Sequence, residues 1–184
     1  MPGEESLVLE ARKGDLGAFA QVYEEYFDRV FRYAYARIGN WAEAEDLASE
    51  VFLKALQGLD SYEPRGLPFS AWLFRIAHNL VVDHLRRKTR RPTEELDERM
   101  PLTDASPDEQ VAQTMTLADV RKAMGTITEQ QRKVIALRFA GGLSIAETAQ
   151  VMGKKEGAIK ALQHSAIQAV RRRLENDGYK LDQP

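Results

Sequence analysis

The stretch SIAETAQVMGKKEGAIKALQH, residues 144–164, decides the fold of the C-terminal part of the chain. Ser144 is followed three positions later by Glu147, which is the pattern of a capping box at the start of a helix. A short helix is therefore predicted over residues 145–152, and Gly153 supplies the tight turn that follows it. A second helical pattern begins directly afterwards, so the stretch has the layout of a helix–turn–helix unit.

The second helix of this unit is predicted over Lys155–Leu174. Ala149 is small enough for the two helices to cross closely, and Ile159 is placed to hold the second helix against the first. Such a helix can enter the major groove of DNA with its N-terminal end first. A plain helical hairpin with a solvated charged face explains the spacing about equally well. The candidate DNA contacts, on the exposed face and at the helix end, are Lys155, Glu156, Lys160, His164, Arg171 and Arg172.

The distribution of charge favours DNA binding. The 184 residues carry 26 basic and 28 acidic side chains, and a net charge of −2 does not by itself suggest a nucleic-acid partner. Residues 111–184, however, have 12 basic and 7 acidic side chains, whereas residues 93–110 have 1 and 7. An acidic middle thus conceals a basic C-terminal third. A further basic cluster, residues 86–91, lies just before the acidic segment.

Several function classes are excluded by composition. The chain has no cysteine, so it has no disulfide, thiolate metal site or cysteine nucleophile. No apolar run approaches the ~18 residues of a membrane span, and the first ten residues lack a signal-peptide pattern. His78 and His84 are six residues apart and do not have the spacing of a helical metal pair. We therefore expect a cytoplasmic protein that is not an enzyme, is not inserted in a membrane and holds no metal or cofactor.

Helical periodicity predicts an all-α protein of two small helical domains. No strand pattern of any length is present. Residues 92–112 contain three prolines and few large apolar side chains, which indicates a flexible acidic linker between domains at 1–91 and 113–176, with a tail at 177–184. The other predicted helices are Glu4–Lys13, Asp15–Ile38, Trp41–Gln57 capped by Asn40, Ala71–Lys88 capped by Ser70, Thr116–Met124, and Glu129–Phe139 capped by Thr128.

Three motifs in this order resemble those of the extracytoplasmic-function (ECF) sigma factors, group 4 of the sigma-70 family. Residues 44–55, AEDLASEVFLKA, resemble the helix that binds RNA polymerase. Residues 69–79, FSAWLFRIAHN, with DHLRR at 83–87, resemble the helix that melts and reads the minus-ten promoter element. Residues 129–139, EQQRKVIALRF, followed by the helix–turn–helix unit, resemble the domain that reads the minus-thirty-five element. The resemblance covers about residues 7–174.

The resemblance implies a promoter-recognition subunit whose partners are promoter DNA, core RNA polymerase through its β′ and β subunits, and an anti-sigma factor. The acidic face of the helix at 41–57 would dock on the coiled coil of β′. Ser49 stands where the family usually has Gln. The implied polymerase-binding residues are Glu43, Asp46, Ser49, Glu50 and Leu53.

The loop and helix that follow residues 41–57 would bind the separated non-template strand. A base flipped out of the stack must be captured, because capture offsets the unstacking free energy of a few kcal/mol. The loop Asp60–Phe69 would form the wall of the capturing pocket, and Asn79 would read the base edge. Trp72 is expected in the core rather than as a stacking platform. The implied minus-ten contacts are Tyr62, Phe69, Asn79, Asp83, Arg86 and Arg87.

The recognition helix departs from the family at Leu162 and Ser165, where arginines are common, so contacts carried there do not transfer. The resemblance also suggests a response to a stress or envelope signal, and an acidic linker that threads through polymerase channels built for RNA. The alternative function is a free-standing helix–turn–helix regulator. A regulator of that kind has no need for an acidic docking helix beside a strand-reading loop.

Overall fold

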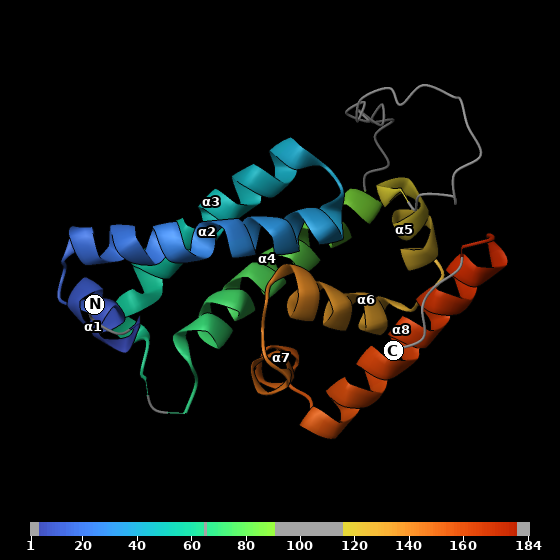
Figure 1. The fold of residues 1–184 in the computed structure, drawn as a ribbon. Helices are drawn as coiled ribbons and strands as arrows, with labels where there is room; N and C mark the ends of the chain where they lie inside the picture. The colour runs from blue at the N-terminus through green and yellow to red at the C-terminus, as the bar shows by residue number, and fades with distance from the viewer. Residues whose placement is uncertain (1–3, 65, 91–115, 180–184) are drawn as a thin grey trace.

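The structure is a computed structural model, and it describes residues 4–64, 66–90 and 116–179. Within those ranges every regular element is a helix, which confirms the all-α prediction (Figure 1). The predicted linker and residues 180–184 of the predicted tail lie outside the described residues. The elements are α1 (Glu4–Arg12), α2 (Leu16–Ile38), α3 (Trp41–Gly58), the 3₁₀ turn η1 (Leu59–Ser61), α4 (Phe69–Arg90), α5 (Leu117–Met124), α6 (Glu129–Ile135), the π-helical turn η2 (Ala136–Ala140), α7 (Ile145–Met152) and α8 (Glu156–Asn176).

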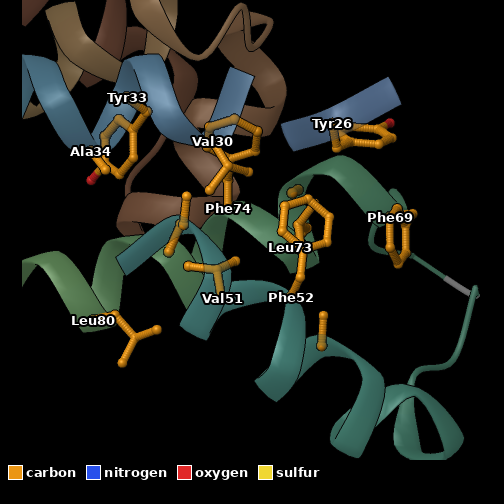
Figure 2. Close-up of a cluster of buried hydrophobic side chains, with 14 of the residues drawn as sticks. Tyr26, Val30, Tyr33, Ala34, Val51, Phe52, Phe69, Leu73, Phe74 and Leu80 are labelled. Carbon is orange, nitrogen blue, oxygen red and sulfur yellow. The ribbon is translucent and has the colours of Figure 1, made fainter. Parts of the chain in front are cut away.

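The first half of the protein, residues 4–90, is built around α2, α3 and α4. The Asp15 side chain caps α2, and Gly39, at φ 80°, ends it in the left-handed conformation that favours glycine. The Asn40 side chain then caps α3 by accepting from the Glu43 backbone N–H at 3.0 Å, as the sequence predicts. Figure 2 shows side chains from α2, α3 and α4 pointing into one core. The buried face of α3 is the predicted set: Ala44, Leu47, Ala48, Val51, Phe52 and Ala55.

The prediction that Ser70 caps the fourth helix is wrong. Helix α4 begins at Phe69, and the Trp72 backbone N–H already bonds the Pro68 carbonyl at 3.1 Å. Ser70 therefore lies inside the helix, is 5% exposed, and donates its hydroxyl to the Glu147 carboxylate of α7. The hydroxyl that the local sequence predicts as a helix cap makes a tertiary contact instead.

The second half, residues 116–179, is organised by three capping boxes, in front of α5, α6 and α7. The boxes predicted at Thr128 and Ser144 are confirmed. The predicted helix over 129–139 is divided, because α6 passes into the wider turn η2, where the Gly141 N–H bonds the Ala136 carbonyl at 2.9 Å. The predicted contact between Ala149 and Ile159 is also present, in a small buried cluster with Val134.

The two halves pack against each other. Helix α4 contacts α7, and α2 contacts η2 (Figure 1). Leu137, Leu143 and Val151 of the second half belong to the same buried cluster as Phe74 of α4. At Gly141 the two halves come so close that an added Cβ atom would lie 2.6 Å from Phe74 Cε1. Only a residue without a side chain fits there.

Candidate nucleic-acid interface

The outward side of α3 is acidic with exposed apolar residues. Asp46 and Glu50 are exposed, and Leu53, three residues further along the helix, is 56% exposed. Glu50 lies 3.8 Å from Lys54 on the same helix, an exposed pair of little energetic weight. Asp46, Glu50 and Leu53 are called the acidic face below. A carboxylate pair beside an uncovered leucine is suited to a protein partner with basic and apolar groups.

Two of the predicted polymerase-binding residues have hydrogen-bond partners within this chain. The Glu43 side chain is half-buried and turns towards α4, where its carboxylate oxygens lie 3.0 Å from His84 Nε2 and 3.2 Å from Lys88 Nζ. Ser49 is exposed, but its hydroxyl donates to the Glu45 carbonyl of its own helix at 3.0 Å. The structure therefore does not bring Glu43 into the acidic face, and it gives the Ser49 hydroxyl a local partner.

The loop between α3 and α4 walls a pocket of about 550 Å³, here called the loop pocket. Tyr62 and Phe69 are both buried and lie in edge contact, with ring centroids 5.6 Å apart. The Tyr62 hydroxyl donates to the Leu67 carbonyl at 3.0 Å and fixes the loop. The volume lies within the range of ligand sites. Its described lining is Glu5, Val8, Tyr62, Pro64, Gly66, Leu67, Pro68, Phe69 and Gln150.

The remaining predicted minus-ten residues lie further along α4. Asn79, Asp83, Arg86 and Arg87 are all exposed, and Asp83 lies 3.9 Å from Arg86. They follow the helix away from the loop pocket, and Asn79 is not part of its described lining. The structure thus joins Tyr62 and Phe69 in one pocket and leaves the other four as a polar track on α4.

Trp72 is half-buried and packs against the core, with ring centroids 5.2 Å from Tyr62 and 5.5 Å from Phe69. It contacts both rings that wall the loop pocket. It therefore supports the pocket and is absent from its described lining, as expected of a core residue.

Helix α8 presents its N-terminal half to solvent. Lys155, Glu156, Lys160 and His164 are all exposed, so the predicted face is confirmed as accessible. In Figure 1 this helix runs along the outer edge of the second half, away from α2 and α3. At its other end Arg172 is exposed and Arg171 is half-buried. The face carries the charges that major-groove and phosphate contacts require.

The orientation of α8 is fixed by hydrogen bonds from α6 and η2. The Arg138 guanidinium donates to the Leu143 carbonyl and, at 2.8 Å, to Gln163 Oε1. Gln131 donates to the Ser165 hydroxyl at 2.9 Å, and Leu162 packs on the Val134 cluster. Leu162 thus packs inward, whereas Ser165 is exposed and joins α8 to α6 through its hydroxyl.

A polar cluster of exposed and buried side chains lies where the halves meet. Arg37 of α2, whose side chain is 3% exposed, forms an ion pair with Glu129 of α6. The Tyr33 hydroxyl is hydrogen-bonded to His78 Nδ1 at 2.9 Å. Burial, together with the charges of Lys133 and Arg37, lowers the pKa of His78 to about 4. Burial also raises the pKa of Tyr33, against the smaller opposing effect of Arg37.

Glu129 and Glu147 both have lowered pKa values, although loss of solvent around each carboxylate opposes the shift. Burial alone would raise the pKa of Glu129, but the charge and hydrogen bond of Arg37 outweigh it. For Glu147, burial is outweighed by hydrogen bonds from Ser144 and Ser70. Both carboxylates are thus held ionised by contacts, and in each case one contact comes from the first half.

Sequence reasoning missed Gln150. It lies on α7 and donates to the Gly66 carbonyl of the loop at 3.3 Å, which places it on the wall of the loop pocket. The two residues are 84 positions apart, and no local pattern signals their contact. Missed as well were Glu5 and Val8 of α1, which line the same pocket. Only the packing of separate elements reveals them.

The described residues form neither a membrane span nor a metal site. Across the described ranges, no helix combines the length and hydropathy of a membrane span. Within the same ranges, His, Cys, Asp and Glu side chains form no group of three that could hold a metal ion.

Comparisons with known proteins agree with the geometry. Residues 22–91 match the family Sigma-70 region 2, and residues 123–172 match Sigma-70, region 4. The fold and its exposed faces therefore define a sigma-70 type promoter-recognition protein. The chain is 42% identical over 173 residues to the ECF RNA polymerase sigma factor BldN of Streptomyces coelicolor, an alignment that covers 93% of this chain and 66% of BldN. It is 34% identical over 180 residues to the ECF RNA polymerase sigma factor SigD of Mycobacterium tuberculosis, covering 93% of this chain and 84% of SigD.

Solved structures show the same likeness. A structure of CnrH in complex with the cytosolic domain of CnrY has a TM-score of 0.70 and 25% identity, over 94% of this chain and 97% of that one. The sigma factor RpoE from Bartonella quintana, in complex with the anti-sigma factor NepR, has a TM-score of 0.65 and 27% identity, over 85% of this chain and 96% of that one. The chain belongs to the ECF RNA polymerase sigma factors. Its predicted function, the direction of RNA polymerase to promoters, is thereby confirmed.

Proposed function

We propose that this factor docks on core RNA polymerase through the acidic face of α3. The observation that carries the proposal is the exposure of Asp46, Glu50 and Leu53 on one helix that otherwise packs its apolar side into the core. An acidic surface is a poor partner for DNA, since it repels phosphates. A basic coiled coil on the β′ subunit fits it in charge, and the β subunit is a second contact of the assembled enzyme.

The loop pocket and α4 are proposed to take the non-template strand at the minus-ten element. Tyr62 and Phe69 offer the apolar, aromatic wall that an unstacked base needs. Asn79 and Asp83 would contact bases further along the strand, and Arg86 and Arg87 would contact phosphates. All four side chains are exposed on α4.

Helix α8 is proposed to read the minus-thirty-five element as duplex DNA. Its exposed Lys155, Glu156, Lys160 and His164 lie at the end of the helix that enters the major groove. Arg171 and Arg172 lie about two turns beyond His164 and would act on the phosphate backbone. The proposed domains are those of the sequence analysis, with boundaries at 1–91, 92–112, 113–176 and 177–184.

The factor is proposed to act without catalysis, cofactor or metal of its own, in the cytoplasm, where the polymerase works. An anti-sigma protein is the proposed regulator, because RpoE of B. quintana was solved with the anti-sigma factor NepR. A stress or envelope signal that releases such a protein would then set the activity of the factor.

Docking is tested by the double charge reversal Asp46→Lys, Glu50→Lys. Both side chains are exposed, so the fold should persist while affinity for purified core polymerase falls by about tenfold or more. The matched control is Glu24→Lys, Glu25→Lys on the exposed side of α2, which changes the net charge equally. Equal affinity of both double variants for core polymerase would contradict the docking assignment.

A further inference from the structure

Helix α1 lies beside the loop pocket, although it precedes every residue assigned above to polymerase or to DNA. It packs along α2 and contacts the 3₁₀ turn η1, where the loop begins. Val8 of α1 is 1% exposed and belongs to the large buried cluster, and it also belongs to the described lining of the pocket. Helix α1 is therefore part of the loop pocket as well as part of the core.

Arg12, in the last turn of α1, holds the start of the loop. Its Nη2 donates to the Asp60 carbonyl of η1 at 3.2 Å, between residues that are 48 positions apart in the chain. A charged donor makes a stronger hydrogen bond than a neutral one. Leu59, in the same turn, is 2% exposed and packs in the core. The turn is thus held by an apolar side chain on the inside and by a guanidinium nearer the surface.

The position of η1 sets the direction of the Tyr62 ring. Tyr62 follows the turn directly, and its backbone N–H bonds the Leu59 carbonyl at 3.1 Å. Its ring contacts Phe69, and its hydroxyl donates to the Leu67 carbonyl at 3.0 Å on the far side of the loop. A shift of η1 would therefore move both the aromatic wall and the loop that the hydroxyl holds.

This support acts on the pocket without lining it. Arg12 is not part of the described lining, so its effect on a captured base is indirect. Arg12, Asp60 and Tyr62 all lie in the first half, and their contacts do not depend on where the second half is. A loop that is fixed before its ligand arrives loses less conformational entropy on binding. Arg12 can thus strengthen capture by keeping the wall in place.

We propose that Arg12 is a positioning residue for strand capture, which holds η1 against α1 so that the Tyr62 ring is in place for an unstacked minus-ten base. The inference rests on the proposed function of the loop pocket. A cation at the end of α1 also has a purely local use, because it interacts favourably with the helix C-terminus. A direct contact of Arg12 with a DNA phosphate is the other alternative, and the experiment separates all three.

The test uses Arg12→Met, which keeps the apolar stem and removes the charge and the donors. Holoenzyme is reconstituted with each factor, and affinity is measured for the single-stranded non-template minus-ten oligonucleotide of a promoter that it transcribes. The oligonucleotide is used intact and with an abasic site at each position in turn. Wild-type holoenzyme should lose affinity at the position of the captured base. Arg12→Met should bind the intact strand about tenfold more weakly and lose little more at that position, because both changes act on one stacking contact.

Two matched variants control for charge. Lys13→Met removes the same charge from the exposed neighbouring residue, and it should bind the intact strand as the wild type does and keep the full abasic loss. Arg12→Lys keeps a charged donor and should recover most of the affinity. All three variants should bind core polymerase and the minus-thirty-five duplex with wild-type affinity, because α3 and α8 are unchanged.

The outcomes distinguish the inference from the proposed function. Wild-type affinity of Arg12→Met for the intact strand would overturn the positioning role. Losses from Arg12→Met and from the abasic site that add in full would overturn it as well, since Arg12 would then act on a phosphate or on stability. If no abasic site lowered the affinity of the wild-type holoenzyme, the pocket would capture no base, and the proposed function would fail whatever Arg12→Met showed.

Discussion

At the scale of single residues, His78 couples the packing of the halves to pH. It faces Tyr33 and Arg37 of α2 and Glu129 and Lys133 of α6. Its pKa is about 4 in the folded protein, against 6.5 in the unfolded chain. The unfolded state therefore binds more protons between these values, so the free energy of unfolding falls as the pH falls from 6.5 towards 4. From this residue we expect a loss of about 2 kcal/mol between pH 7 and pH 5, measured by urea denaturation.

The variant His78→Gln keeps a polar group beside Tyr33 and removes the titration. It should lose less stability than the wild type between pH 7 and pH 5. His164→Gln, on the exposed face of α8, should retain the full wild-type loss. If both variants lost as much stability as the wild type, acid sensitivity would have to come from carboxylates such as Glu129 rather than from His78.

At the scale of secondary-structure elements, the capping box of Ser144 and Glu147 sets the start of α7. The Ser144 hydroxyl accepts from the Glu147 N–H at 3.1 Å, and the Ser144 N–H donates to the Glu147 carboxylate at 2.7 Å. Ser144 is exposed, so its side chain has little packing to lose. Ser144→Ala should lower the free energy of unfolding by about 1 kcal/mol, and Ser144→Asp, also a good cap, should stay near the wild type. Equal losses in both variants by urea denaturation would show that the cap is not the cause.

Helices of this protein were largely predictable because their ends carry local chemistry. Asn40, Thr128 and Ser144 bond backbone groups three residues away, and such contacts can be read from sequence. Ser70 and Glu43 have equally suitable local patterns, but their side chains bond residues 77 and 41 positions away. Their surroundings depend on how α3, α4 and α7 pack, and no local pattern contains that information.

The candidate site, too, was predictable where it depends on local sequence and not where it depends on packing. Exposure of the acidic face and of the charged face of α8 followed from helical periodicity, because each helix buries its opposite side. The wall of the loop pocket was predicted in the loop Asp60–Phe69, which supplies Tyr62, Pro64, Gly66, Leu67, Pro68 and Phe69 of its described lining. Gln150 joined it through a contact between the halves, and Asn79 fell outside its described lining since it lies ten residues further along α4 than Phe69.

At the scale of the whole molecule, the acidic linker is proposed to have a function beyond connection. Residues 93–110 carry 7 acidic and 1 basic side chains, a charge that is unfavourable beside DNA and suited to channels that hold RNA. Neutralising these carboxylates at constant length should leave promoter binding intact and change holoenzyme assembly, initiation or promoter escape in reconstituted transcription. The substitutions to Gln or Asn are at Glu94, Glu95, Asp97, Glu98, Asp104, Asp108 and Glu109.

A linker with the same residues in shuffled order is the control for that experiment. It keeps the charge and should behave as the wild type does. If the neutral variant showed wild-type assembly, initiation and escape, the linker would serve only to connect the two domains.

The outward position of α8 in the packed molecule has a consequence for gene dosage. Copies of the factor that exceed the available polymerase would still carry an uncovered Lys155, Lys160 and His164. They would occupy upstream promoter elements without opening them, and so compete with holoenzyme for the same sites. Transcription from a target promoter should therefore pass through a maximum and decline as the factor is titrated beyond polymerase in excess.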